Sequence, residues 1–183
     1  MDALKEIHRA MKRHSALGLV WNAEDYNSPR DHKASTAWEQ KLQDLTFRIV
    51  KESGDQEPRF RDAQWRKVFD EQVKMTPLSL ITASSDQLFS LPIAEHHEPF
   101  EVKLSEEKLW ERYSTLGHVA TLEGEQKDKF TREFKEIVNS AEKDANGELV
   151  VHGNAYAVWT TKIPAEGRTA EDAVEDVEQA EAS

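Results

Sequence analysis

The chain has 183 residues, a formal net charge of −11 at pH 7 and no cysteine. The acidic charge argues against binding to nucleic acid or to an anionic membrane surface, and no apolar run is long enough to cross a bilayer. The lack of cysteine excludes disulfides, thiolate catalysis and zinc–cysteine sites, and it fits a cytoplasmic protein.

The first 54 residues predict a helix, a strand and a second helix. Apolar residues at helical spacing indicate a helix over residues 3–13. Residues 16–22 are almost all apolar, which is typical of a strand buried on both faces of a parallel sheet. Thr36 followed three residues later by Glu39 is a capping-box pattern that starts the second helix, and Gly54 is its expected end.

The middle of the chain is less regular. Asp62 is a favourable N-cap for a short third helix. Residues 75–97 are interrupted by two prolines, and residues 78–82 within them allow either a short strand or a turn of helix. Residues 100–104 alternate between apolar and polar, which predicts a half-buried strand, and Ser105 is expected to cap the helix that follows.

The last third predicts a long helix and a final strand region. The helix covers residues 123–141 and has one apolar side. Asn146 and Gly147 predict a turn, and residues 148–163 are rich in valine, tyrosine, tryptophan and threonine, which favour strands. Gly153 either bends this strand or splits it into a hairpin.

The end of the chain differs in composition from the rest. From Pro164 onward seven acidic residues stand against one basic residue, Arg168, and aromatic residues are absent. Such a segment cannot bury enough apolar surface to offset the entropy of ordering. We therefore predict one domain over residues 1–164 and a disordered acidic tail over residues 165–183, with an acidic docking segment as the alternative.

The order helix, strand, helices, strand, helices, strand predicts an α/β domain with a small mixed sheet. Several segments also resemble, in order and spacing, the late part of class I S-adenosylmethionine-dependent methyltransferases, especially fungal proteins related to trans-aconitate methyltransferase. The similar segments are ALKEIHR and LGLVWN in residues 3–22, PRFR at 58–61, WRKVF at 65–69, LWERYSTL at 109–116 and HGNAYAVWTTKIP at 152–164. The resemblance implies a partial, Rossmann-like methyltransferase fold that contains the last three strands of the family's sheet and several helices.

The resemblance also implies where the parts of that fold lie. Residues 16–22 correspond to the family's fifth strand, which lies between the fourth and the seventh, and the final strand region corresponds to the seventh. The family binds S-adenosyl-L-methionine through a glycine-rich loop and an acidic residue at the carboxyl ends of the first strands, as other doubly wound folds bind nucleotides. Two features depart from the family pattern: residues 13–15 replace a glycine pair, and no two of the seven glycines are separated by a single residue. We therefore expect the chain to lack the amino-terminal, cofactor-binding half.

In such a fragment the family's fourth strand is missing, so the strand at residues 16–22 has no neighbour on that side. It then forms an apolar sheet edge with unpaired amide and carbonyl groups, which favours pairing with another chain. We expect a homodimer or a partner chain bound through the strand between Ala16 and Asn22.

Candidate site residues lie after the fifth strand and on the helices. Those for a small-molecule substrate are Trp21, Trp38, Trp110 and Tyr113, the candidate for the cofactor is Asn22, at the carboxyl end of a strand, and the candidate base is His118. Each has a packing alternative, since the helical aromatic residues lie on apolar stripes. No metal site is expected, because the adjacent His96 and His97 point apart on an extended segment.

Three functions are compatible with these features. The first is S-adenosylmethionine-dependent methylation of a small molecule, in which this chain is a truncated product or half of a site completed by another polypeptide. The second is a catalytically inactive methyltransferase-like remnant that acts as a binding or dimerisation module. The third is a cofactor-free remnant that holds a small molecule and templates its cyclisation. Binding of S-adenosylmethionine separates the first from the others.

Overall fold

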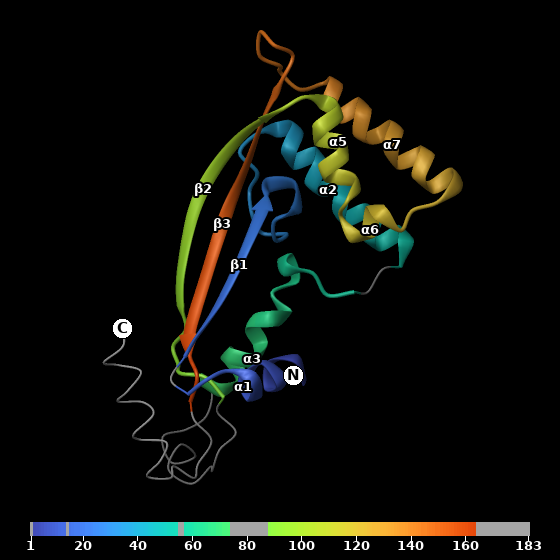
Figure 1. The fold of residues 1–183 in the computed structure, drawn as a ribbon. Coiled ribbons are helices and arrows are strands. Elements are labelled where there is room, and N and C mark those ends of the chain that lie inside the picture. The colour runs from blue at the N-terminus through green and yellow to red at the C-terminus, as the bar shows by residue number, and fades with distance from the viewer. Residues whose placement is uncertain (1, 14, 55–56, 74–87, 164–183) are drawn as a thin grey trace, which may run out of the picture. The chain divides into compact units, whose positions relative to one another are not determined.

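The computed structural model describes residues 2–13, 15–54, 57–73 and 88–163 (Figure 1). The predicted acidic tail, His14 and most of the unassigned stretch before residue 88 lie outside these residues. The elements are α1 (Asp2–Ala10), β1 (Ala16–Glu24), a 3-10 turn (Asp25–Asn27), α2 (Ala37–Ser53), a second 3-10 turn (Phe60–Asp62), α3 (Gln64–Val73), β2 (Ala94–Leu104), α5 (Glu106–Ser114), α6 (Gly117–Ala120), α7 (Gly124–Asn139) and β3 (Leu149–Thr161). The chain is α/β, as predicted.

Two helices begin at the capping residues that the sequence indicates. The Thr36 hydroxyl accepts a hydrogen bond from the main-chain N–H of Glu39 at 3.3 Å, at the start of α2. The Ser105 hydroxyl accepts one from the N–H of Lys108 at 3.3 Å, at the start of α5. Gly54 ends α2 with a φ of 70°, a conformation that favours glycine.

The third helix begins near the predicted place, although Asp62 has a different role. Its carboxylate accepts a hydrogen bond from the main-chain N–H of Arg59 at 2.8 Å and so closes the 3-10 turn that precedes α3. The sequence identified the residue as a cap, and the structure shows that the capped turn is the one before the helix.

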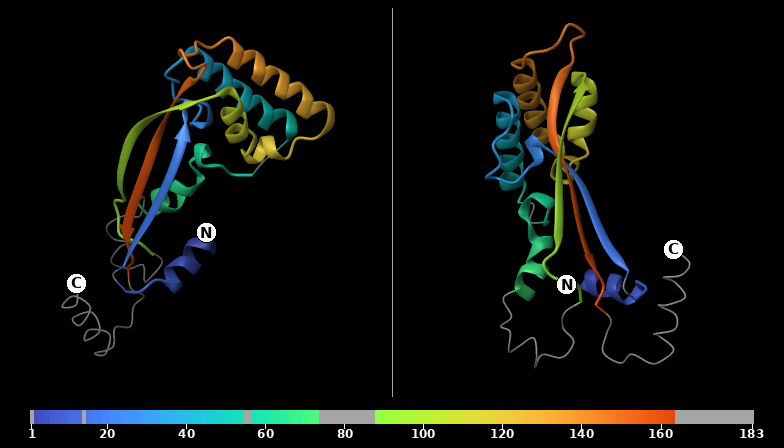
Figure 2. Two further views of the ribbon diagram at one scale, coloured as in Figure 1. Left: turned by 45° about the horizontal axis from the view of Figure 1, so that its top comes forward. Right: turned by 90° about the vertical axis from the view of Figure 1, so that its left-hand side faces the viewer.

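The three strands form one small antiparallel sheet in the order β1-β3-β2, with β3 between the other two (Figure 2). The predictions of a parallel strand at residues 16–22 and of a mixed sheet are therefore wrong. This strand is not buried on both faces either, since Leu17 is 9% exposed and Val20 is 73% exposed. A continuous apolar run reports the tendency to be buried and contains no information on the direction of the neighbouring strand.

β2 is longer than predicted, and β3 lies within the predicted region of residues 148–163. β2 begins at Ala94, and its last residues alternate in burial as expected for a half-buried strand. β3 is continuous through Gly153, so the glycine does not create a hairpin. A Cβ atom at Gly153 would lie 2.5 Å from Cζ of Phe100 and 2.7 Å from the carbonyl oxygen of Ala23. The glycine therefore allows a close approach between β3 and its surroundings.

The chain divides into two compact units, and each strand contributes residues to both. The helical unit consists of Trp21–Ala63 and His97–Tyr156. In it, α2 packs against α6 and α7, and α5 packs against α6. The core includes Leu42, Ile49, Phe134, Val138 and Leu149, all with no exposed surface.

The terminal unit contains residues 1–20, 64–96 and 157–183, as far as the structure describes them. Its buried core is formed by Leu17, Phe69 and Phe89, and Leu4 of α1 and Met11, just after α1, pack against it. Nε2 of His8 lies 2.7 Å from the carbonyl oxygen of Ile163 and joins α1 to the segment after β3. No helix within the described ranges has both the length and the apolar character required to cross a membrane.

Candidate functional site

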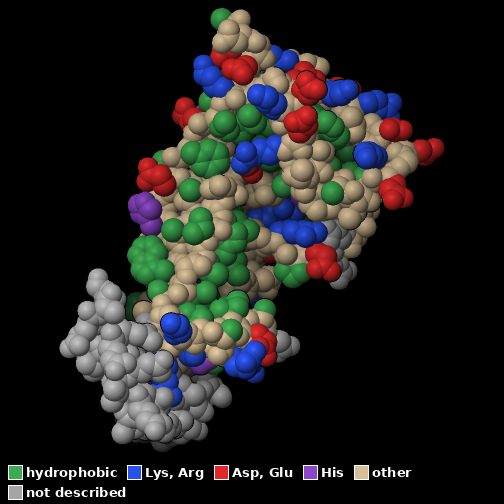
Figure 3. All heavy atoms as spheres, viewed as in Figure 1, with side chains coloured by type: hydrophobic (Ala, Val, Ile, Leu, Met, Phe, Trp, Pro, Cys, Tyr) green, Lys and Arg blue, Asp and Glu red, His purple; other side chains and the backbone are tan. Residues whose placement is uncertain are grey.

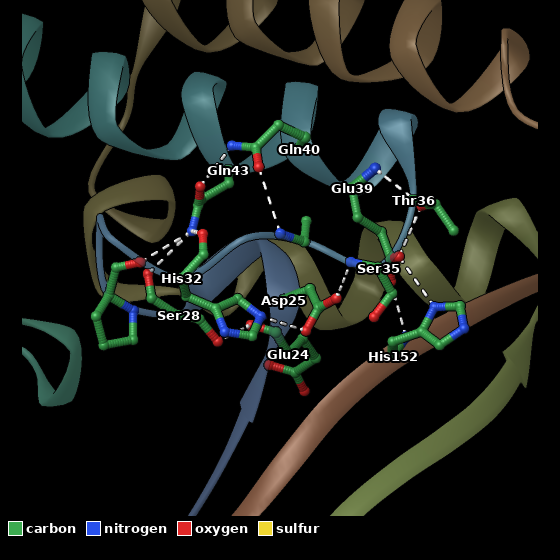
Figure 4. A network of polar contacts seen from close by, with 12 residues as sticks. Glu24, Asp25, Ser28, His32, Ser35, Thr36, Glu39, Gln40, Gln43 and His152 are labelled. Carbon is green, nitrogen blue, oxygen red and sulfur yellow. Dashed lines mark hydrogen bonds and ion pairs between the residues drawn. The ribbon is translucent and has the colours of Figure 1, made fainter.

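Two buried carboxylates lie where β1 ends in the helical unit. Glu24 is the last residue of β1, Asp25 begins the 3-10 turn, and they are 5% and 1% exposed. Oδ1 of Asp25 lies 2.8 Å from Nε2 of His32, and Oδ2 accepts a hydrogen bond from the main-chain N–H of Ser35 at 2.6 Å (Figure 4). Asp25 thereby fixes the loop between β1 and α2.

The environment of Asp25 favours its ionised form. Burial acts to raise the pKa of this carboxyl group, but the hydrogen bonds from Ser35 and His32 outweigh burial, and the pKa is lowered overall. The nearby imidazole adds a favourable electrostatic interaction with the charge. Asp25 is therefore a buried anion that is held by donors on two sides.

Polar side chains of α2 hold the same loop from the other side. The amide nitrogen of Gln43 donates to the carbonyl oxygens of Pro29 at 3.0 Å and of His32 at 3.3 Å. Gln40 donates to Gln43 at 2.7 Å and accepts the N–H of Ala34 at 3.3 Å (Figure 4). These contacts satisfy main-chain groups of a loop that is only partly buried.

Glu24 is paired with a cation from α5. The guanidinium group of Arg112 contacts the Glu24 carboxylate through two of its nitrogen atoms. Burial raises the pKa of the adjacent Tyr26 strongly, and the charge of Glu24 raises it further. Tyr26 therefore stays neutral over the ordinary pH range. In the ion pair beside it, the Glu24 side chain is 7% exposed and the Arg112 side chain is 43% exposed.

A second carboxylate–histidine pair joins α2 to β3. Glu39 has no exposed surface, and its carboxylate accepts the main-chain N–H of His152 at 2.7 Å and contacts Nδ1 of the same residue at 2.9 Å. The hydroxyl of Thr36 also donates to Glu39, at 2.7 Å. A proton on Nδ1 satisfies this geometry, which leaves Nε2 of His152 facing Glu101 at 3.6 Å.

Four rings form a row in the helical unit. The ring centroid of Phe60 lies 5.0 Å from that of Trp21 and 4.9 Å from that of Tyr156, and His97 lies 4.5 Å from Tyr156 on the other side. Burial and the charge of Asp25 both raise the pKa of Tyr156. The row therefore brings together one residue of each strand and Phe60 of the second 3-10 turn.

A surface groove lies near the second carboxylate–histidine pair. It has a volume of about 510 Å³ and lies between the first turn of α2, the residues after α7 and the start of β3, with Trp38 and Val150 among its lining residues. Two charges on its rim are already paired, because Lys143 contacts Glu106 at 3.2 Å and Asp144 contacts Lys103 at 2.9 Å. The volume is within the range of small-molecule sites.

Of the residues that the sequence suggested as one site, Trp38, Trp110 and Tyr113 belong to one hydrophobic cluster of the core. Trp110, half-buried, and Tyr113, 1% exposed, are neighbours in the core, with ring centroids 6.3 Å apart. His118 is 1% exposed, and Trp38 is 8% exposed and also lines the groove. Trp21 is half-buried in the aromatic row, and Asn22 is exposed on β1.

Sequence reasoning missed most of the polar network. Glu24 and Asp25 follow Asn22 after one intervening residue, Ala23, so their position at the end of a strand was the available signal. Glu39 was identified only as a capping residue. Nothing in the local pattern connects it with His152, which is 113 residues away in the chain.

The described glycines do not form the loop that S-adenosylmethionine requires. Two of them lie inside strands, Gly54 ends a helix, Gly117 and Gly124 begin helices, and Gly147 lies in a turn. None occupies a strand-to-helix turn in a position to approach a ligand closely. The residues described here therefore do not fit the methyl donor. Within the same ranges, no group of three or more histidine and carboxylate side chains is placed to hold a metal ion.

Comparison with known proteins found neither a family model nor a curated protein that matches this sequence.

Proposed function

We propose that the chain is a class I methyltransferase polypeptide that acts on a small molecule and contributes the methyl-acceptor side of the site. The strand order carries this proposal. The resemblance requires the fifth strand to lie beside the seventh, and β1 lies beside β3 in the order β1-β3-β2. Within the described residues, the other edge of β1 has no strand beside it, and the family's fourth strand would lie there.

The polar groups at the end of β1 support the acceptor role. Open, mostly parallel α/β sheets bind their ligands beyond the carboxyl ends of the parallel strands, and by the resemblance β1 corresponds to one of those strands. Here Asp25 orients His32, and Glu39 orients His152, whose side chains are 26% and 21% exposed. An imidazole oriented by a carboxylate is suited to accept a proton from a bound hydroxyl group.

The methyl donor belongs to another segment in this proposal. The glycine positions give no donor loop among the described residues, so we expect S-adenosylmethionine to bind only when a strand, a glycine-rich loop and a helix complete the sheet. We place the protein in the cytoplasm, which its cysteine-free composition permits.

Calorimetry with S-adenosylmethionine tests the proposal. The chain alone is expected to bind more weakly than about 100 µM, and the longest reading frame that contains it is expected to bind more tightly than that. A reading frame without an upstream strand and glycine-rich loop, together with no donor binding, would contradict the proposal. Donor binding tighter than about 100 µM by the chain alone would also contradict the assignment of the donor site to another segment.

The free edge of β1 favours a second candidate, a non-catalytic binding module. Such a module would retain the fold and bind a partner strand but would not bind the methyl donor in any length of the chain. The same calorimetric series therefore separates the two candidates.

A further inference from the structure

The start of β3 extends beyond the end of β1 in the helical unit. The main-chain N–H of Lys162 donates to the carbonyl oxygen of Ser15 at 2.9 Å, and in this antiparallel register Glu24, the last residue of β1, lies opposite Gly153. The residues of β3 before Gly153 therefore have no β1 residue beside them. The first turn of α2 and the residues after α7 border this edge instead, and together with Val150 they line the groove.

Carboxylates replace the missing strand at two positions along this edge. The main-chain N–H of His152 donates to Glu39 at 2.7 Å. The N–H of Glu148 donates to Oδ1 of Asp144 at 3.1 Å, and the carbonyl oxygen of Glu148 accepts the N–H of Asp144 at 2.9 Å. Positions 148 and 152 are therefore already bonded.

Val150 lies between these two positions and remains open. Main-chain groups of residues two apart on a strand point toward the same edge, so the N–H and C=O of Val150 point the same way as those of His152. Within the described ranges, no residue bonds to them along this edge. Val150 is half-buried and lines the groove of about 510 Å³. It therefore offers one donor and one acceptor, side by side, to a molecule in the groove.

The other polar groups of the groove are already used or lie toward solvent. The Thr36 hydroxyl donates to Glu39 at 2.7 Å, and the Ser140 hydroxyl donates to the carbonyl oxygen of Ile137 at 2.7 Å. The charged lining residues, none of which is buried, are Lys41, Glu142, Lys143, Asp144 and Glu148. On the face drawn in Figure 3, acidic and basic side chains are interspersed over the helices. The groove therefore favours an uncharged ligand.

We propose that the groove binds a neutral N-acylated amino acid amide with an apolar side chain. The N–H of this ligand donates to the carbonyl oxygen of Val150, and its C=O accepts the Val150 N–H, as in a hydrogen-bonded pair of an antiparallel ladder. Its side chain contacts the apolar wall that Ala37, Trp38 and Ala141 form. Because residues 148 and 152 are already bonded, a longer strand would gain no further pairing. The groove is a ligand site in addition to the one in the proposed function.

Amide hydrogen exchange of the isotope-labelled full chain, followed by nuclear magnetic resonance, tests the open edge. Without ligand, the Val150 amide is expected to exchange at least about tenfold faster than the bonded amides of Val151 and His152. Equal protection of the three amides would overturn the inference, because another segment or a second copy would then occupy the edge.

Titration with N-acetyl-L-leucinamide tests the ligand class. We expect saturable binding with a Kd of about 1 mM, and slower exchange of the Val150 amide in the complex. The control ligand, N-acetyl-N-methyl-L-leucinamide, lacks the N–H that donates to Val150 and is expected to bind at least about tenfold more weakly. No saturation up to about 10 mM, or equal binding of the two ligands, would overturn the inference.

Variants at Ala37 locate the binding on the chain. Ala37 is exposed at the start of α2 and lines the groove, so Ala37→Phe fills part of the space and is expected to weaken binding by about tenfold. Ala37→Ser adds one small atom and is expected to bind within about twofold of the natural chain. Both variants should keep the circular dichroism spectrum and thermal midpoint of the natural chain. Unchanged or tighter binding by a folded Ala37→Phe variant would place the ligand outside the groove, and the two tests above need no variant.

Discussion

The carboxylate of Glu39 contacts two nitrogen atoms of one residue, the main-chain nitrogen of His152 at 2.7 Å and its Nδ1 at 2.9 Å. The pair joins the first turn of α2 to the central strand of the sheet. Glu39 has no exposed surface, and a buried carboxylate without donors would cost several kcal/mol. The contact with His152 therefore offsets part of the free-energy cost of burying this carboxylate.

Replacing this carboxylate by an amide should destabilise the helical unit. Glu39→Gln keeps the size of the side chain but removes the charge and offers one acceptor oxygen, so we expect a loss of about 1–3 kcal/mol in the free energy of unfolding. Urea unfolding followed by circular dichroism measures the loss. Glu136→Gln, on an exposed part of α7, is the matched control and should change stability by less than about 0.5 kcal/mol. Equal midpoints for the two variants would contradict the role assigned to Glu39.

Two strand glycines should respond oppositely to the same substitution. In Gly153→Ala the new Cβ would meet the Phe100 ring at 2.5 Å and the Ala23 carbonyl oxygen at 2.7 Å, so we expect a loss of about 1–3 kcal/mol. In Gly18→Ala the new atom enters open space, and the change should be neutral or stabilise by up to about 1 kcal/mol. Thermal unfolding of both variants under one set of conditions measures the difference. If Gly153→Ala were as stable as the natural chain, Phe100 and the Ala23 carbonyl group would have to lie farther from Gly153 than these distances.

The successful sequence predictions concern local chemistry. Thr36 and Ser105 cap helices because a hydroxyl can reach an N–H three residues later without any help from the rest of the fold. The alternation of apolar and polar residues at 100–104 likewise predicts correctly that one face of this strand is buried and the other exposed, because successive side chains of a strand point to opposite faces.

The features that the sequence did not predict depend on distant residues. The direction of β3 relative to β1 is set by the whole chain between them, which the apolar run at residues 16–22 does not encode. Trp21 was identified as a site candidate, but its ring partner, Phe60, is on a different element. The site itself arises where β1, α2 and β3 meet, and no single segment shows it.

Asp25 should contribute stability that depends on pH at the acid end. Its pKa is lowered in the folded protein, so the folded state holds fewer protons than the unfolded chain at a given low pH. The contribution of Asp25 to the free energy of unfolding is present above about pH 4 and is lost as the pH falls further. Asp25→Asn should therefore be less stable at pH 7 by about 1–3 kcal/mol and should lose less additional stability on acidification.

Urea unfolding at neutral pH and again near pH 3 measures both effects. Asp31→Asn changes an exposed carboxylate of the same loop and should follow the natural chain at both values. A parallel loss of stability in the natural chain and in Asp25→Asn would show that other carboxyl groups cause the acid transition.

Tyr113 and Tyr26 should destabilise the fold at alkaline pH. Burial raises the pKa of both hydroxyls, and in the unfolded chain each is expected to ionise near pH 10. Above that pH the unfolded chain releases protons that the folded protein keeps, so the free energy of unfolding should fall by up to about 1.4 kcal/mol per pH unit for each tyrosine. Tyr113→Phe removes the 3.1 Å hydrogen bond to Thr46, at a cost of about 0.5–1.5 kcal/mol near pH 7, and should give a shallower alkaline decline.

Urea midpoints across the alkaline range measure the slope, and ultraviolet absorbance of tyrosinate reports ionisation in the same samples. Two of the three tyrosines should ionise only as the circular dichroism of the fold is lost. Full tyrosinate absorbance in a chain that keeps its native spectrum would disprove the burial of these hydroxyls.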